Sequence, residues 1–381
     1  MQQYRTQNYV NRIMEIYEAY SWCAMMDRIL LHDTTLYYPS SPLFLEGLEE
    51  LSPLYKFKYH FFDEGNFLSR QPSLLHRIAH RFLGRSPLPY WSYNRALLDT
   101  ALTFCPEVIL IVKGPYISPK TLLEIKNKTK AFLINYATDD PFNPKNTTKD
   151  LIDCIPLYDL YVSTKQKVMK DIRSAGAKQV AYHPFAYKPS VHFPEHPKTL
   201  EEKKKFESDV VFIGGCDEDR IPYFKALVQA FPNIKLHLYG GYWNKHKALR
   251  PYYRGYVFGR EFRLALGGAK IALNLVRRAN RDGHVMRTFE IPACGAFMLA
   301  ERTEEHLKLL KEDKEAVYFD SPKEMIEKIA YYLLREKERQ NIAKAGYSRV
   351  INNENTYRDR LLQILREVPI VHKTRFVKVN E

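Results

Sequence analysis

The stretch NRDGHVMRTFEIPACG, residues 280–295, places one carboxylate, Asp282, eight positions before another, Glu290. Gly283 directly follows the first acid, which favours a loop at that point. A helix is expected to start near Val285 and to carry Glu290 in its first turns. One acid on a loop and the other at a helix start can both face one small polar ligand. The spacing therefore predicts a ligand site made by a loop and the helix that follows it.

This spacing resembles the acid–seven residues–acid signature of nucleotide-sugar glycosyltransferases with the two-domain GT-B fold. The sequence RTFEIPACGAFMLAE, which begins at Arg287, resembles that of the CgeB-like (spore-maturation) glycosyltransferases, and the resemblance extends from about residue 107 to residue 365. It implies that Glu290 accepts hydrogen bonds from the ribose hydroxyls of a nucleotide. It also implies that Asp282, in place of the commoner glutamate, contacts the hydroxyls of the donor sugar.

The residues around this pair have both a functional and a structural interpretation. The resemblance places Gly283, His284 and Arg287 on the donor side, where His284 would touch the sugar or the phosphate. A structural histidine is the alternative for His284, and a helix-dipole acid is the alternative for Glu290.

Two other predicted strands end in glycine pairs. Residues 209–215 read DVVFIGG and end in Gly214 and Gly215, and residues 238–241 read LYGG and include Gly240. Glycines allow backbone amides to approach a diphosphate closely, and the start of a helix favours anions. Both turns are therefore candidates for the donor site.

The resemblance also implies an arginine directly after the first glycine of the first pair and a lysine five residues further on. Gly215 stands in the first place and Arg220, which opens the next helix, stands in the second. Arg287 or Arg281 would then have to supply the missing cation. The alternative is a tight turn with a surface arginine.

Short apolar runs alternate with helical patterns along the chain, which predicts parallel sheets. Residues 29–31, 55–62, 107–112, 131–136, 160–163 and 179–182 form the first series of predicted strands, and residues 209–213, 235–239, 271–276, 297–300 and 317–319 form the second. The sequence predicts an α/β protein of the GT-B type, two Rossmann-like domains facing each other across a cleft.

A segment rich in proline and charge separates the two series and reads as a linker. The expected organisation is a helical extension over residues 1–26, an acceptor domain over 27–193, a linker over 194–206, a nucleotide-sugar domain over 207–354 and a C-terminal helix and tail over 355–381.

Polar residues after the first-domain strands are candidates for the acceptor side. Lys113 follows the strand at 107–112, and Asp139 and Asp140 follow the strand at 131–136. Either aspartate is a candidate base or a group that orients the acceptor hydroxyl. A turn-forming aspartate before Pro141 is the alternative for each.

Composition limits the cellular setting. No run of about 18 apolar residues is present, the first residues lack the pattern of a secretory signal, and the five cysteines are scattered with no C-x-x-C. These features favour the cytoplasm. The formal charge of +14 suits phosphate-bearing small molecules, and it also allows weak, non-specific contact with nucleic acid or an anionic membrane.

These observations favour transfer of a sugar from a nucleoside diphosphate sugar to a hydroxyl acceptor, which could be a glycan, a protein or a small molecule. Retention of configuration is the expected outcome, and inversion with Asp139 or Asp140 as base stays open. No cofactor or metal is expected, because the acids at 217–219 precede a helix whose dipole accounts for them. The alternatives are a nucleic acid acceptor and a non-catalytic binding or surface-assembly protein of the same fold.

Overall fold

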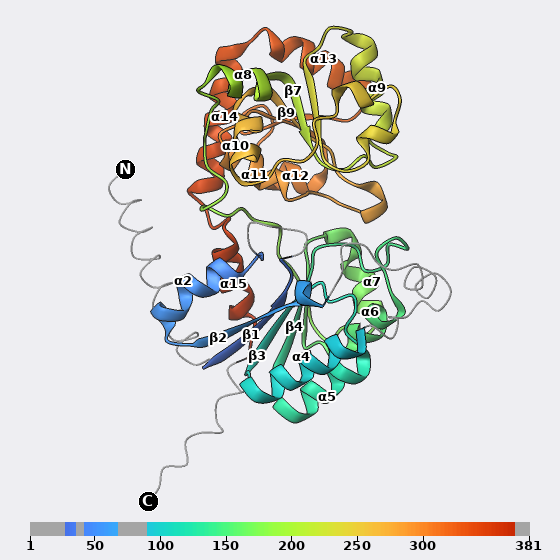
Figure 1. Ribbon diagram of the computed structural model, residues 1–381, viewed down its shortest axis with the longest axis vertical. Helices are drawn as coiled ribbons and strands as arrows, with labels where there is room; N and C mark the ends of the chain where they lie inside the picture. Colours follow the sequence, from blue (N-terminus) through green and yellow to red (C-terminus); the bar gives the residue numbers. More distant parts are fainter. Residues whose placement is uncertain (1–26, 36–41, 68–89, 370–381) are drawn as a thin grey trace, which may run out of the picture. The chain divides into compact units, whose positions relative to one another are not determined.

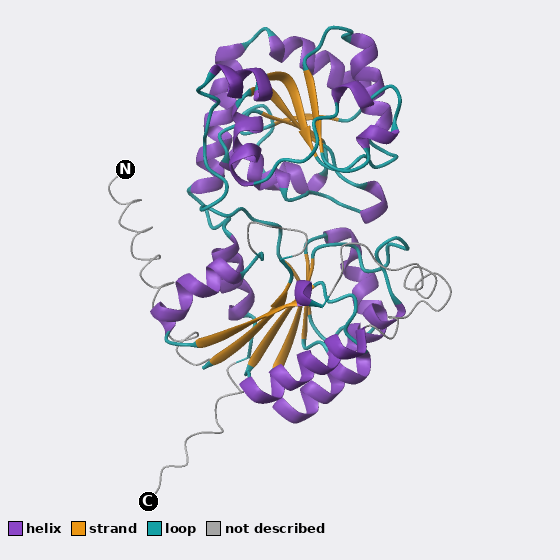
Figure 2. Cartoon of the chain, in the orientation of Figure 1, coloured by secondary structure: helices purple, strands orange, loops and turns teal. Residues whose placement is uncertain are grey.

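The computed structural model describes residues 27–35, 42–67 and 90–369, and the helix expected over residues 1–26 lies outside them. The chain folds as two compact units (Figure 1). The first ends at His183 and includes the chain again from Tyr357, and the second runs from Pro184 to Thr356. Each unit is a parallel β-sheet with helices packed around it (Figure 2), so each is a Rossmann-like α/β domain, as predicted.

The sheet of the first unit has six strands in the order β2-β1-β3-β4-β5-β6. In chain order they are β1 (Arg28–Asp33), β2 (Lys58–Asp63), β3 (Val108–Val112), β4 (Phe132–Ala137), β5 (Leu160–Ser163) and β6 (Val180–Tyr182). Strands β3, β4 and β5 are buried along their whole length, as expected for apolar strands covered on both faces. The chain goes from β1 to β2 on one side and then to β3 on the other, so the switch point of this sheet lies between β1 and β3.

Helices of the first unit connect these strands and cover the sheet. They are α2 (Leu45–Tyr55), α4 (Tyr90–Phe104), α5 (Pro119–Thr129), α6 (Lys149–Cys154), α7 (Met169–Ser174) and α15 (Tyr357–Arg366). Ser118 caps α5 through its hydroxyl, which accepts from the backbone N–H of Thr121 at 3.1 Å. Helix α15 packs against α2, and the rings of Phe44 and Tyr357 meet edge to face at 5.6 Å. This apolar contact places the last helix in the first unit.

The sheet of the second unit has five strands in the order β11-β10-β9-β7-β8. They are β7 (Ser208–Ile213), β8 (Leu236–Tyr239), β9 (Ala269–Asn274), β10 (Met298–Glu301) and β11 (Val317–Phe319). Its helices are α8 (Leu200–Phe206), α9 (Ile221–Ala230), α10 (Gly259–Gly267), α11 (Arg287–Ala293), α12 (Glu304–Leu309), α13 (Pro322–Leu333) and α14 (Glu336–Ile351). The switch point of this sheet lies between β7 and β9.

The boundary between the units differs from the expected linker over residues 194–206. Residues 200–206 form α8, which begins with a capping box made by Thr199 and Glu202 and ends in the buried Phe206. Glu195 forms ion pairs with Arg260 and Arg263 at 2.7 and 2.8 Å. The proline-rich and charged composition suggested a linker, but these contacts attach the segment to the second unit.

The predicted strands all overlap observed ones, with shifted ends. Tyr55 is the last residue of α2 and not the start of β2, and Val276 lies beyond the end of β9. None of the described helices is both long enough and apolar enough to cross a lipid bilayer.

Candidate active site

The carboxyl ends of β7 and β9 are neighbours at the switch point of the second sheet, where open α/β sheets bind ligands. Arg220 joins these two ends. Its Nη1 donates to the carbonyl of Gly215 at 3.0 Å, and its Nη2 donates to the carbonyl of Leu275 at 2.8 Å. The side chain is buried, and burial lowers its pKa. Arg220 therefore holds the two strand ends at a fixed separation.

The sequence suggested that Arg220 binds a phosphate, but the structure shows its charge engaged within the turn. Nη1 also donates to Asp217 at 2.9 Å, and Asp217 forms a second ion pair, at 3.3 Å, with Nε of Arg277. The alternative of a surface arginine is wrong, because the guanidinium is buried against the ring of Phe212. Arg220 shapes the glycine turn from within.

The two glycine turns of this sheet touch each other. Gly240, with φ of 117°, adopts a backbone conformation that favours glycine, and a Cβ there would overlap the carbonyl of Gly214. The indole N–H of Trp243 donates to the same carbonyl at 2.8 Å. Space remains around Gly215, where an added Cβ would have no atom of the described residues within 4 Å apart from its chain neighbours. The turn is thus supported from one side and open at Gly215.

Arg287 brings a cation to the carboxyl end of β7. Its Nε donates to the carbonyl of Ile213 at 3.1 Å, and its guanidinium lies over the ring of Phe262. About 29% of the side chain remains exposed, in contrast to Arg220. Arg287, one of the two arginines considered for the missing cation, thus has contacts that fix it beside this strand end.

Glu290 is buried and lies between a cation and an imidazole. It accepts from Nη1 of Arg287, and its Oε1 is 3.6 Å from Nε2 of His192. Nδ1 of His192 accepts from the backbone N–H of Lys188 at 3.0 Å, so in the neutral ring the proton is on Nε2 and faces Glu290. Burial lowers the pKa of His192, and Glu290 partly opposes this shift. Glu290 therefore lies beside the guanidinium of Arg287 and the imidazole of His192.

Asp282 forms hydrogen bonds with other residues of the loop in which it lies. Its Oδ1 accepts from the side-chain amide of Asn280 at 2.9 Å, and its Oδ2 accepts from the backbone N–H of Arg277 at 3.2 Å. Arg281 between them has φ of 48°, in the left-handed region. The side chain of Asp282 is buried. The loop between β9 and α11 thus depends on this carboxylate for its shape.

The acids at 217–219 also take part in local structure. Asp217 pairs with Arg220 and Arg277, and Asp219 accepts from the backbone N–H of Arg278 at 2.8 Å. Within the described ranges, no group of three or more histidine, cysteine, aspartate or glutamate side chains is arranged to hold a metal ion.

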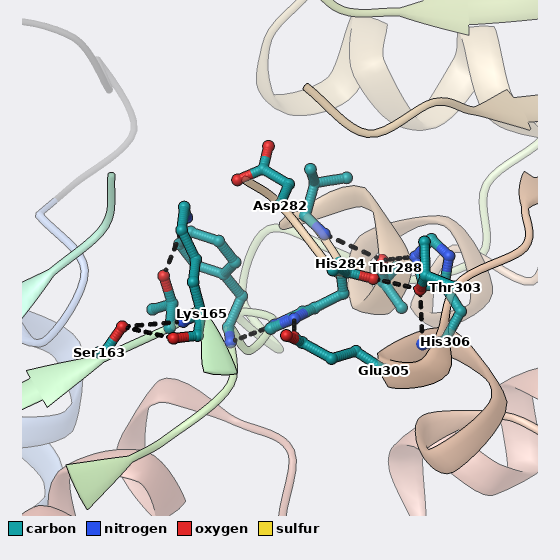
Figure 3. Close-up of polar contacts among 12 residues, drawn as sticks. Ser163, Lys165, Asp282, His284, Thr288, Thr303, Glu305 and His306 are labelled. Atoms are coloured by element: carbon teal, nitrogen blue, oxygen red, sulfur yellow. Dashed lines mark hydrogen bonds and ion pairs between the residues drawn. The ribbon is translucent and has the colours of Figure 1, made fainter. Parts of the chain in front are cut away.

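His284 is a buried structural connection, which is the alternative considered for it. Its Nε2 accepts from the backbone N–H of Phe185 at 3.0 Å, and its Nδ1 donates to Glu305 at 2.6 Å (Figure 3). The rings of Phe185 and Phe289 contact its edge and face. Gly283 is needed beside it, because a Cβ at that position would overlap the carboxyl group of Glu305. These two residues thus support the loop that carries Asp282.

A second buried network, not anticipated from the sequence, fixes the start of α11. Nδ1 of His306 donates to the carbonyl of Glu301 at 2.7 Å, so its Nε2 accepts from the hydroxyl of Thr288 at 2.9 Å. The hydroxyl of Thr303 donates to the carbonyl oxygen of Gly283. Figure 3 shows this network beside the His284–Glu305 pair. Burial lowers the pKa of His306 to about 4. In the sequence, the signal for this network was the presence of polar residues at two helix starts, Thr288 at one and Thr303 and His306 at the other.

On the first unit, the predicted acceptor-side residues come together in part. Lys113 and Asp139, which follow β3 and β4, form an ion pair at 2.5 Å. Asp140 accepts from the backbone N–H of Phe142 at 2.9 Å, which is the turn alternative considered for it. The structure therefore unites Lys113 with Asp139 and gives Asp140 a turn role.

The same edge of this sheet also carries residues that the sequence analysis missed. His32 lies near the end of β1, Glu64 directly follows β2, and Tyr93 on α4 connects the two. Polar residues directly after two predicted strands were the available signal, but the contact with Tyr93 depends on the tertiary fold.

Residues 220–366 match a family model described as glycosyl transferase-like. No curated protein matches the chain. Solved structures resemble the chain over most of its length. The sucrose-phosphate synthase of Thermosynechococcus elongatus has 11% identity and a TM-score of 0.63, with 89% of this chain and 98% of that chain covered.

The HepE protein of Anabaena, solved in complex with UDP-glucose, has 12% identity and a TM-score of 0.57, with 90% of this chain and 98% of that chain covered. AviGT4, a glycosyltransferase involved in avilamycin A biosynthesis, has 14% identity and a TM-score of 0.52, with 89% and 97% covered. At these identities the likeness establishes the fold, which is GT-B, as predicted from the sequence.

Proposed function

We propose that this glycosyltransferase of the GT-B fold transfers a sugar from a nucleoside diphosphate sugar to a hydroxyl acceptor. The observation that carries the proposal is the Arg287–Glu290 pair fixed at the switch point of the second sheet, beside the open turn at Gly215. A cation and a carboxylate side by side suit a ligand that carries a diphosphate next to ribose hydroxyls. The solved complexes of HepE with UDP-glucose and with UDP support sugars of uridine diphosphate as the first donors to test.

In this proposal the open turn and Arg287 receive the diphosphate. Backbone amides near Gly215 approach the phosphate oxygens, and the exposed part of the Arg287 guanidinium donates to them. Glu290 accepts from the ribose hydroxyls. Arg220 acts indirectly, because its donors hold Gly215 and Leu275 in place.

Transfer is proposed to proceed with retention and without a metal ion. The acceptor oxygen forms a bond to the anomeric carbon while the bond from that carbon to the diphosphate breaks. The acceptor proton passes to the departing diphosphate on the same face of the sugar, so no protein base is required. Asp282 then serves to hold the loop and to face the sugar hydroxyls, and catalysis rests on positioning and on stabilisation of the leaving phosphate. The same proposal includes membership of the CgeB-like family, which the sequence from Arg287 onward suggests. It also includes a cytoplasmic location, which the composition suggests.

Thermal unfolding against a panel of nucleoside diphosphate sugars tests the proposal. A donor at 100 times its dissociation constant stabilises the folded state by about 2.7 kcal/mol, which is a measurable rise in the unfolding temperature. The anomeric configuration of the glycoside product, read by proton NMR, then distinguishes retention from inversion. Absence of a shift with every nucleoside diphosphate sugar at millimolar concentration contradicts the proposal.

A further inference from the structure

A polar cluster of the first unit lies at the switch point of its own sheet, apart from the donor residues. Strand β1 has β2 on one side and β3 on the other, so the carboxyl ends of these three strands are adjacent. His32 is the next-to-last residue of β1, Glu64 directly follows β2, and Lys113 directly follows β3. Ligands of open α/β sheets bind at this position. The family match over residues 220–366 does not include this cluster.

A hydroxyl group connects the two titratable side chains of the cluster. Nε2 of His32 is 2.6 Å from the hydroxyl oxygen of Tyr93, and the Tyr93 hydroxyl donates to Oε2 of Glu64 at 3.4 Å. His32 stacks on the ring of Phe62, with 5.7 Å between the ring centres. His32 and Tyr93 are fully buried, whereas 6% of the Glu64 side chain is exposed. Of these three hydrogen-bonded residues, Glu64 is therefore the one that a ligand can contact.

Two polar atoms of the cluster have hydrogen-bonding capacity to spare. No hydrogen bond reaches Oε1 of Glu64 from any residue in the described part of the chain. Nδ1 of His32 is buried and likewise lacks a partner within the described ranges. The Glu64 side chain is 6% exposed, whereas His32 is fully buried, so Oε1 of Glu64 is the atom of the cluster that can form a hydrogen bond with a ligand. The cluster has the hydrogen-bonding chemistry to receive a hydroxyl compound.

The three connected groups are uncharged near pH 7. Burial raises the pKa of Glu64 to about 8, with Asp33 and Asp63 adding to the shift and Lys113 opposing it. Burial lowers the pKa of His32 to about 4 and raises that of Tyr93. A protonated carboxyl group both donates and accepts one hydrogen bond, as a sugar hydroxyl does.

Among the described residues, the charges that act on Glu64 are mainly negative. Asp33 accepts from the backbone N–H of Leu43 at 2.8 Å, and Asp63 accepts from that of Gly65 at 2.8 Å, so the backbone fixes an oxygen of each side chain. Lys113 is the cation of the group, and it is paired with Asp139. A phosphorylated ligand would meet repulsion here, while an uncharged ligand would not.

We propose that Glu64, with Tyr93 and His32 behind it, binds the attacking hydroxyl of an uncharged, hydroxyl-rich acceptor such as a sugar or a glycan. This inference rests on the function proposed above, because it concerns the acceptor of that transfer. Glu64 orients the acceptor oxygen and does not take its proton, which passes to the leaving diphosphate. The arrangement disfavours nucleic acid and other phosphorylated acceptors.

An acceptor array with UDP-glucose as donor tests the class of acceptor. The array contains p-nitrophenyl glycosides, each paired with its 6-phosphorylated counterpart. The expected result is transfer to at least one unphosphorylated member, with a kcat/KM about tenfold or more above that of its phosphorylated partner. Transfer only to phosphorylated members, or to no glycoside, overturns the inference. Hydrolysis of UDP-glucose without acceptor is followed in parallel, and its absence together with absence of UDP binding would instead reject the proposed function.

Variants at Glu64 test its role. Glu64→Ala should lower the acceptor kcat/KM about tenfold or more, with the KM for the donor unchanged. Glu64→Gln imitates the protonated acid, so it should keep most of the activity at pH 7. The wild-type rate should fall as the pH rises through about 8, and the Glu64→Gln rate should not. Glu124→Gln, a change on the exposed helix α5, is the matched control.

Two outcomes contradict this role. If Glu64→Gln abolishes transfer and the wild-type rate rises through pH 8, Glu64 is a general base and the positioning role is wrong. If Glu64→Ala keeps the wild-type kcat/KM for the acceptor, the cluster does not bind the acceptor. Circular dichroism of each variant separates loss of fold from loss of contact, and Tyr93→Phe provides a milder change that removes only the connecting hydroxyl.

Discussion

Arg287 donates to Glu290 across one turn of α11, so a cation and a carboxylate reach the carboxyl end of β7 as one unit. The hydrogen bond from Nε of Arg287 to the carbonyl of Ile213 attaches the pair to the strand. A buried carboxylate is costly without a partner, and Arg287 with His192 provides that partner before any ligand binds. The proposed donor site is therefore preorganised by protein contacts.

Replacement of Glu290 should weaken nucleotide binding. In Glu290→Ala two hydrogen bonds from ribose to a charged acceptor are lost, each worth about 1.5–3 kcal/mol, so the Kd for UDP should rise at least about tenfold. Calorimetric titration with UDP measures this, and Glu327→Ala on the exposed face of α13 is the control. An unchanged Kd would remove the ribose role from Glu290.

Replacement of Arg287 should affect the diphosphate more than the nucleoside. Loss of a charge-assisted hydrogen bond costs about 1.5–3 kcal/mol, so Arg287→Ala should weaken UDP binding about tenfold or more and change uridine binding much less. Arg287→Lys keeps a positive charge beside Glu290, so its Kd for UDP should lie between those of the wild type and of Arg287→Ala. Equal losses for UDP and uridine would mean that Arg287 only supports Glu290.

Asp282→Ala should spare the affinity for UDP and impair turnover of the full sugar donor. Asn280→Ala is the matched variant, because it removes one hydrogen bond from the same loop but leaves the carboxylate in place. Steady-state kinetics with a UDP-sugar and calorimetry with UDP are compared for both. If the two variants lose turnover equally, Asp282 acts only through the loop and does not contact the sugar.

Activity should persist in the presence of excess chelator, because Asp217 and Asp219 have partners in Arg220 and in the backbone of Arg278. Hydrolysis or transfer is measured with and without EDTA, then with added manganese or magnesium. Loss of activity with EDTA that the metal restores in the wild type and not in Asp217→Asn would show that the acids at 217–219 hold a metal ion.

Stability should depend on pH through His306. Its pKa is about 4 in the folded protein against an ordinary value of 6.5, so between these values the unfolded chain binds more protons and the free energy of unfolding decreases as the pH falls. This group contributes up to about 3 kcal/mol to that decrease. Denaturant unfolding of the wild type and of His306→Gln between pH 7 and pH 4 measures the difference. Parallel curves for the two proteins would contradict the assignment.

The sequence by itself determined the features that depend on local pattern. Apolar runs such as Val108–Val112 and cap residues such as Ser118 act over a few neighbours, so the strands and the α/β class could be predicted from local pattern. The GT-B fold was implied by the family resemblance of the stretch that carries Asp282 and Glu290. The glycine turns and the Asp282–Glu290 spacing likewise follow from positions close together in the chain.

Only the tertiary structure decided how distant residues combine. Arg220 binds the carbonyl of Leu275, 55 positions away, because the strand order makes the ends of β7 and β9 adjacent. His32 on β1 meets Tyr93 across 61 positions because helix α4 packs against that strand. Likewise, α15 joins the first unit because its apolar face meets α2. Local preferences determine each strand and turn, but a side chain's partner depends on which strand ends the fold brings together, and that is set by the packing of the whole sheet.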